Sequence, residues 1–400
     1  MKLENKKLNT FTLSGLIIGP ILGSGVILLP PLLYNMIGNF SLIIWSVILV
    51  FGFAFALVFG KLAILFPGDG GVSLATKEAM GKKYQLLTSF YLICAVFFGP
   101  VAVLLIAGDF LKEYFPNIPI EILGFCIYII TYILLLIKID FLGKLMLIIS
   151  SIITMIFFVS SLNILLSTNE FIFTLPIISI KDIGYSFLLI FWAIVGWEVI
   201  GNYSNEVDDT KTLTNAVIFS AVIVSLVYIL IVLAISFGEF ENKSNEAFKL
   251  VWLIEPIFGE LSSFILSSIS IILCIGTLIL FVGGVARLIS SLKISKLSSK
   301  HLSNGVAIGS INLLSMIYIF TLFLVYYNIL KLDDLVAFAD GFFIANAIIG
   351  LITAIILFEK GLLKYLAIVL TILFFAILLF SNVFVLLTIF SLFLFTYLKK

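Results

Sequence analysis

The stretch GLIIGPILGSGVILLPP, residues 15–31, lies in the middle of the first long apolar segment of the chain. Three glycines and one proline fall between Gly19 and Gly25. Proline removes a backbone donor and glycine disfavours helix, so we predict an interrupted helix at Gly23–Gly25. The alternative is that these glycines only let neighbouring helices approach closely. An interruption would expose backbone amides at the start of the second half-helix, where the dipole favours a carboxylate.

A second unusual stretch, FWAIVGWEVIGN, covers residues 191–202 and places Glu198 deep inside apolar sequence. A charged side chain at the centre of a bilayer costs at least about 2.5 kcal/mol. We therefore expect Glu198 to face the protein interior, where it serves transport. The alternative is a protonated glutamic acid that hydrogen-bonds a neighbouring helix.

The composition of the whole chain predicts an all-α integral membrane protein. Of its 400 residues 62% are hydrophobic and 11% are charged, and the mean hydropathy is +1.29. No soluble domain carries such a surface. Apolar segments long enough to cross a bilayer recur along the chain. We predict about twelve transmembrane helices, at residues 11–34, 40–66, 84–108, 118–137, 141–167, 183–204, 214–238, 257–286, 304–328, 335–358, 361–380 and 383–398.

The positions of the basic residues orient these helices. Cytoplasmic loops collect Lys and Arg. With a cytoplasmic N-terminus, eighteen of the 23 Lys and Arg residues fall on the cytoplasmic side, and five fall outside, namely Lys112, Lys181, Lys243, Lys249 and Lys331. The cytoplasmic set includes the terminal residues Lys2, Lys6, Lys399 and Lys400. We therefore expect a multi-pass protein of the inner (plasma) membrane with both termini in the cytoplasm.

Several function classes are excluded by what the chain lacks. A net charge of +1 gives no basic excess for nucleic acid. The three cysteines, Cys94, Cys126 and Cys274, lie singly in different spans, so we expect small core residues rather than disulfides or metal ligands. The one histidine, His301, falls in a predicted loop. With no catalytic grouping in the spans, we expect neither an enzyme nor a bound cofactor.

The two interruptions occupy the first and the sixth predicted helix. Inverted-repeat transporters place discontinuous helices at corresponding positions of their two halves, with the substrate between them. We therefore expect one transporter domain, residues 1–400. It consists of a five-helix repeat at 11–167, a second, inverted repeat at 183–358, and a helix hairpin at 361–398.

The motifs resemble those of the amino acid–polyamine–organocation (APC) permeases. Residues 23–30, GSGVILLP, are similar to the Gly-Ser-Gly motif of their first helix, and residues 191–198 are similar to their sixth-helix motif. Weaker similarity is found in PGDGG at 67–71 and in EVDD at 206–209. The resemblance implies the five-plus-five inverted-repeat fold and transport of amino acids, with the lipid bilayer as surroundings and H+ or Na+ as coupling ion.

The resemblance also implies a main-chain substrate site. The amides of Ser24 and Gly25 would bind the substrate carboxylate, and the carbonyls of Ile21, Trp192 and Val195 would accept hydrogen bonds from its ammonium group. Trp192 would cover the substrate as a gate. Gly23 and Gly196 complete the expected substrate site. Glu198 matches a family glutamate linked to gating or proton coupling.

Other features bear on substrate and coupling. Pro20 stands where arginine/agmatine antiporters have an asparagine, which argues against a guanidinium substrate, and the fifth span lacks a lysine that could replace sodium. The chain length and residues 338–343, FADGFF, look most like the compact bacterial exporters of methionine and branched-chain amino acids. Asp340 in this stretch is either a second protonatable coupling site or a residue at the outer mouth.

Three properties stay open in the sequence. These are the coupling ion, the direction of transport, and whether the protein is a monomer or a homodimer. An amino acid sensor with a transporter fold, such as a germinant receptor subunit, is the alternative function, because a shared fold cannot exclude it.

Overall fold

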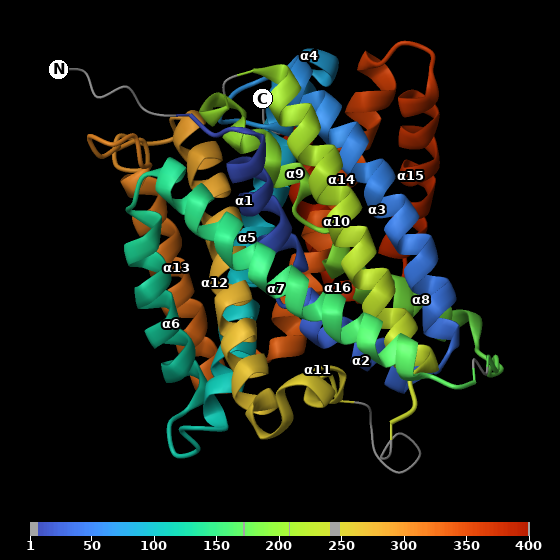
Figure 1. The fold of residues 1–400 in the computed structure, drawn as a ribbon. Coiled ribbons are helices and arrows are strands. Elements are labelled where there is room, and N and C mark those ends of the chain that lie inside the picture. Colours follow the sequence, from blue (N-terminus) through green and yellow to red (C-terminus); the bar gives the residue numbers. More distant parts are fainter. Residues whose placement is uncertain (1–6, 171–172, 208, 241–248, 399–400) are drawn as a thin grey trace.

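The computed structural model describes residues 7–170, 173–207, 209–240 and 249–398 as a bundle of helices (Figure 1). In these residues the only non-helical pairing is an isolated parallel bridge between Leu8 and Val207. Lys2, Lys6, Asp208, Lys243, Lys399 and Lys400 lie outside the described residues. The all-α expectation is confirmed.

The first half of the chain forms seven α-helices. They are α1 (Thr10–Leu22), α2 (Gly25–Ile37), α3 (Phe40–Leu65), α4 (Val72–Met80), α5 (Lys82–Lys112), α6 (Ile120–Leu135) and α7 (Ile139–Ser167). Helices α1 and α2 together occupy the first predicted span. The short helix α4 lies in the predicted loop after the second span.

The second half contains the remaining α-helices and three 3₁₀ helices. They are α8 (Ile180–Ile190), η1 (Phe191–Ile194), α9 (Trp197–Ile200), η2 (Gly201–Glu206), α10 (Thr210–Phe237), α11 (Val251–Phe258), η3 (Gly259–Leu261), α12 (Ser262–Ser291), α13 (Ile308–Tyr326), α14 (Leu332–Leu357), α15 (Leu362–Leu378) and α16 (Val383–Leu398). The predicted sixth span is thus divided among α8, η1, α9 and η2.

Within the described residues, nine helical segments are long and apolar enough to cross a membrane. Three shorter apolar helices, α6, α15 and α16, occupy the other predicted spans. A helix needs about 20 apolar residues to cross a bilayer unaided, so length alone does not decide whether these three helices cross it. The chain is therefore a multi-pass helical membrane protein with at least the nine long segments.

The first span lies at the centre of the bundle. In the apolar window of Thr10–Ile37, 89% of the residues are buried, against 33% for Ile139–Ser167. Every residue of α1 from Thr12 to Leu22 is buried, so this helix is covered on all sides. It packs against α7, α10 and α12. An interruption in this helix therefore opens into protein and not into lipid.

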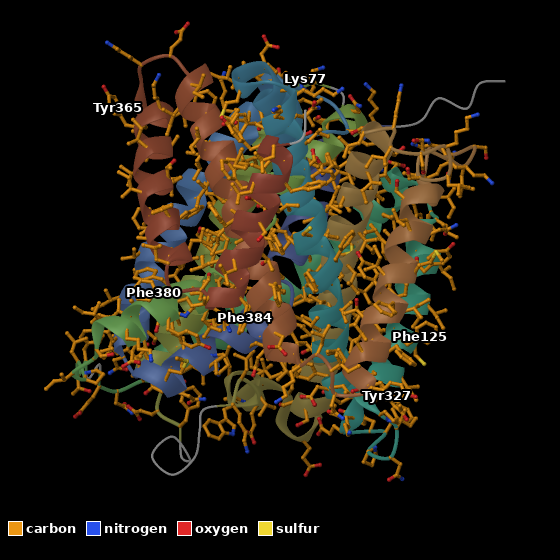
Figure 2. All side chains as sticks on the ribbon, turned by 180° about the vertical axis from the view of Figure 1, so that it is seen from behind. Lys77, Phe125, Tyr327, Tyr365, Phe380 and Phe384 are labelled. Atoms are coloured by element: carbon orange, nitrogen blue, oxygen red, sulfur yellow. The ribbon has the colours of Figure 1, made fainter. Side chains whose placement is uncertain are left out.

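The outside of the bundle carries large apolar side chains. Figure 2 shows Phe125, Tyr327, Tyr365, Phe380 and Phe384 projecting from the surface, and each of them is exposed. Such a surface suits lipid, which is as apolar as the core.

The expected core position of the cysteines is correct for Cys274 and wrong for Cys126. Cys274 is buried in α12, Cys94 is half-buried in α5, and Cys126 is exposed on α6. Helix α6 packs against α5, α12 and α13 and turns its other side to the surroundings. An apolar helix of this kind gives no sequence signal for the side that is buried.

Candidate functional site

The first interruption lies between α1 and α2, at Gly23 and Ser24, within the predicted stretch. Gly23 has a φ of +44°, a conformation that favours glycine. A Cβ atom at Gly23 would collide with the Thr277 hydroxyl and with the Pro20 carbonyl. The helix therefore ends here because glycine alone fits the turn.

Side chains from distant helices bind the carbonyls that the interruption leaves free. The Thr277 hydroxyl of α12 donates to the Pro20 carbonyl at 3.0 Å, and the Tyr228 hydroxyl of α10 donates to the Leu22 carbonyl at 3.3 Å. In the part of the chain that the structure describes, the main-chain amides of Ser24 and Gly25 donate no hydrogen bond. These two amides begin α2 and are available for a ligand.

Gly25 leaves no room for a side chain. A Cβ atom at this residue would lie 2.8 Å from the Tyr228 hydroxyl and 3.6 Å from Cδ1 of Trp192. The absence of a side chain thus keeps the backbone at the start of α2 accessible.

The second interruption lies at Val195 and Gly196. The 3₁₀ helix η1 ends at Ile194, Val195 is extended with a ψ of 140°, and Gly196 has a φ of +125°. The Glu198 carboxylate accepts a hydrogen bond from the Gly196 amide at 3.0 Å. Glu198 is 1% exposed, and its second carboxylate oxygen has no hydrogen-bond partner among the described residues. Glu198 therefore stabilises the interruption from inside the protein.

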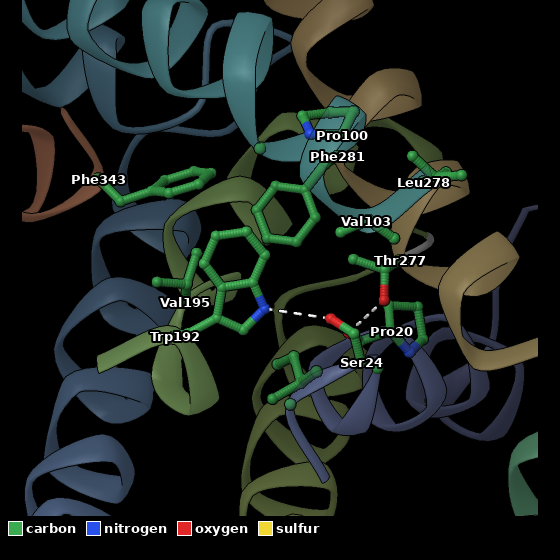
Figure 3. Close-up of a pocket in the computed structure, with 14 residues that line it drawn as sticks. Pro20, Ser24, Pro100, Val103, Trp192, Val195, Thr277, Leu278, Phe281 and Phe343 are labelled. Carbon is green, nitrogen blue, oxygen red and sulfur yellow. Dashed lines mark hydrogen bonds between the residues drawn. The ribbon is translucent and has the colours of Figure 1, made fainter. Parts of the chain in front are cut away.

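The two interruptions meet at one small cavity of about 20 Å³, the central cavity (Figure 3). The indole Nε1 of Trp192 donates to the hydroxyl of Ser24 at 3.2 Å across it. This volume is room for about one water molecule in this conformation. The cavity is lined by Pro20, Ile21, Gly23, Ser24, Gly25, Gly99, Pro100, Val103, Trp192, Val195, Thr277, Leu278, Phe281 and Phe343.

Six of the seven predicted substrate-site residues line the central cavity: Ile21, Gly23, Ser24, Gly25, Trp192 and Val195. Gly196 lies next to it, and a Cβ atom there would approach the Ile21 side chain to 3.2 Å. The two predicted gating residues, Glu198 and Asp340, do not line it. Glu198 lies beyond Gly196 in the chain, and Asp340 lines a second cavity.

The sequence analysis missed the residues that complete the central cavity. Thr277, Phe281 and Phe343 come from α12 and α14, and Gly99 and Pro100 come from the middle of α5. The Gly-Pro pair inside an apolar span is the one signal that could have indicated a part of this wall. The other residues look like ordinary members of apolar helices.

A larger cavity of about 300 Å³, the vestibule, adjoins the central cavity. Ser24, Gly25 and Trp192 line both, so the indole of Trp192 lies at the passage between them. The vestibule is lined by Ser24, Gly25, Leu28, Leu29, Leu32, Ile106, Tyr185, Leu188, Leu189, Trp192, Leu332, Asp333, Val336, Ala337, Asp340, Ser381 and Asn382. These residues place it toward the end of the bundle where α2 ends and α8 begins (Figure 1).

At the opposite end of the bundle, where α1 begins, an ion pair joins η2 to α12. The Arg287 guanidinium lies 3.1 Å from the Glu206 carboxylate and 4.6 Å from the ring centre of Tyr203. The Tyr203 hydroxyl donates to the Leu280 carbonyl at 2.8 Å, and the Leu8 amide donates to the Glu206 carbonyl at 2.8 Å. Contacts from three parts of the chain thus close this end around η2.

Comparison with known proteins identifies the family of the chain. Residues 8–299 match the model of a family described as amino acid permease. The chain belongs to the amino acid permease family. The match includes both interruptions and every cavity residue up to Phe281.

A curated relative of this permease is the L-methionine/branched-chain amino acid exporter YjeH of Escherichia coli (strain K12). It is 23% identical over 348 residues, which cover 82% of this chain and 81% of the relative. The permease is therefore a membrane transporter and not an enzyme, and an amino acid is the class of substrate that its family implies.

Proposed function

We propose that this permease carries an apolar amino acid across the plasma membrane by alternating access. The observation that carries the proposal is the meeting of the two interrupted helices at an apolar cavity. The free amides of Ser24 and Gly25 suit the substrate carboxylate. Main-chain carbonyls of Ile21, Trp192 and Val195 are the proposed acceptors for the ammonium group.

The walls of the central cavity support an apolar substrate. Phe281, Phe343, Val103 and Leu278 line the cavity with apolar side chains. Within the described chain no Asp, Glu, Lys or Arg lines the central cavity, so a charged substrate side chain would lose its hydration without a partner. Methionine and the branched-chain amino acids are the substrates that we propose, in agreement with the name of the relative.

The proposed orientation makes the structure open to the outside. With both termini in the cytoplasm, the vestibule lies on the extracytoplasmic side and the Glu206–Arg287 pair closes the cytoplasmic side. The twelve apolar helices would then form two inverted five-helix repeats, 11–167 and 183–358, followed by the hairpin 361–398. Separation of Glu206 from Arg287 is the step that would expose the central cavity to the cytoplasm.

We assign Glu198 to the coupling step. Its carboxyl group holds the amide of the second interruption, so a change in its charge would act directly on the backbone that forms the site. We therefore propose proton coupling or proton-linked exchange, with sodium as the alternative coupling ion.

The test uses purified protein in proteoliposomes loaded with labelled leucine. Unlabelled amino acids are added outside as a competition panel, with and without sodium and with and without a pH gradient. Methionine, leucine, isoleucine and valine should release the label, and arginine and glutamate should not. Tight binding of an amino acid without any release would contradict transport and favour the sensor.

A further inference from the structure

The vestibule contains a buried carboxylate without a partner. Asp340 of α14 is 3% exposed, and its Oδ1 has no hydrogen-bond partner in the described part of the chain. Among the described residues its side chain makes no hydrogen bond or ion pair, and no Lys or Arg lines the vestibule. A buried carboxylate is costly unless a cation or donors compensate it, so this position is suited to a ligand.

The surroundings of Asp340 define the shape of that ligand. Leucines of α2 and α8, namely Leu28, Leu29, Leu188 and Leu189, form an apolar wall of the same vestibule. A cationic head beside an apolar tail fits such a cavity. A primary ammonium group supplies three donors to one carboxylate, whereas a metal ion needs a shell of several oxygen ligands. Among the residues that the structure describes, Asp340 is the only buried carboxylate that lines the vestibule.

We propose that the vestibule holds a second binding site, in which Asp340 binds the ammonium group of an apolar amine or amino acid beside Trp192. In the proposed transport cycle, on which this role rests, the amino acid occupies the site on the outer side of the Trp192 gate. The two sites bind opposite ends of the same molecule. Asp340 binds the ammonium group, and the amides of Ser24 and Gly25 bind the carboxylate.

The experiment uses isoamylamine, which is leucine without its carboxylate, and 4-methylpentanoate, which is leucine without its ammonium group. Binding to purified protein is measured by calorimetry and by the ligand-induced rise in melting temperature. Isoamylamine should bind the wild type, and Asp340→Asn should weaken its binding by at least about tenfold, as expected for the loss of a buried charge partner. Binding of 4-methylpentanoate should differ by less than about twofold between the wild type and Asp340→Asn, because this compound lacks the ammonium group that Asp340 binds.

Asp109→Asn is the matched control. Asp109 in α5 is exposed to solvent and is not among the residues that line the vestibule, so its loss should leave isoamylamine binding within about twofold of the wild type. Without ligand, Asp340→Asn should melt at the same or a higher temperature than the wild type, because an uncompensated buried charge is removed. A lower melting temperature would show that Asp340 is a structural partner and would overturn the proposal.

Two further results would also overturn it. One is equal binding of isoamylamine to the wild type and to Asp340→Asn. The other is displacement of the amine when sodium replaces choline at constant ionic strength, since Asp340 would then hold a metal ion. Amine binding is measured without transport, so failure of the proposed exchange activity would be seen separately from failure of this site.

Discussion

The indole of Trp192 donates a hydrogen bond to the hydroxyl of Ser24 at 3.2 Å, and this bond joins the two interrupted helices of the permease. Trp192 belongs to η1 and Ser24 directly precedes α2, so residues far apart in the chain close one passage. Both line the central cavity and the vestibule. The bond therefore couples the conformation of the two helices to access to the site.

The Trp192–Ser24 bond can be removed while an aromatic ring is kept. Trp192→Phe should weaken binding of the preferred substrate by about fivefold, the value of a hydrogen bond of about 1 kcal/mol. Trp192→Ala should weaken it further, because the apolar cover is lost as well. Equilibrium binding of labelled leucine is the measurement. Trp252→Phe in α11, at a residue that does not line the central cavity, should bind leucine as the wild type does.

The lack of a side chain at Gly25 is required for the site. Gly25→Ala would place its Cβ 2.8 Å from the Tyr228 hydroxyl, so the Tyr228 side chain or the start of α2 must shift, and substrate affinity should fall by at least about tenfold. Gly99→Ala is the matched control in the same cavity, because a Cβ there has only ordinary contacts of 3.5 Å or more. Equal affinities of the two variants would mean that the amides of α2 do not hold the substrate.

Glu198 can lose its charge without losing its hydrogen bond. In Glu198→Gln the amide oxygen can still accept from the Gly196 amide, so the fold should be kept. Since glutamine does not titrate, the pH dependence of leucine exchange should become flatter if this carboxyl carries the coupling proton. The measurement is the initial rate of leucine exchange at each pH at which the protein is stable. Asp140→Asn is the control and should keep the pH dependence of the wild type. If the pH dependence of Glu198→Gln also has the wild-type shape, Glu198 does not carry the coupling proton.

The Glu206–Arg287 pair is expected to hold the end of the bundle where α1 begins. The two side chains are 30% and 17% exposed, so the pair is worth only about 1 kcal/mol. Arg287→Ala should have the larger effect, because Arg287 also donates to the Gly283 carbonyl at 3.1 Å and lies over Tyr203. Hydrogen exchange at the amides of residues 201–207 should become faster in Arg287→Ala than in Glu206→Gln.

The control for this pair is Asp140→Asn, which breaks the exposed Asp140–Lys144 pair within α7. It should leave exchange at residues 201–207 unchanged. The charge-reversed double variant Glu206→Arg/Arg287→Glu should restore part of the protection that each single variant loses, since it restores opposite charges. If hydrogen-exchange protection of residues 201–207 is unchanged in Arg287→Ala, other contacts keep this end of the bundle closed, such as the hydrogen bond between Leu8 and Glu206.

Much of the site was predictable because it consists of breaks in regular structure. Gly23, Gly25 and Gly196 are visible in sequence because glycine interrupts apolar helices, and the structure ends helices at those positions. Gly196 is nevertheless adjacent to the cavity and not part of its lining. Asp340 was visible as a carboxylate in an apolar span, but its place in a separate vestibule was not.

The sequence by itself determined the helical membrane fold and the two interruptions, because hydrocarbon permits only backbone that satisfies its own hydrogen bonds. Only the tertiary structure decided that Thr277, Phe281 and Phe343 face the cavity and that Tyr228 limits the space at Gly25. These helices are apolar on every side, since lipid and protein interior have the same polarity. Without a polar side to mark the surface, the inward direction of each helix follows from packing alone.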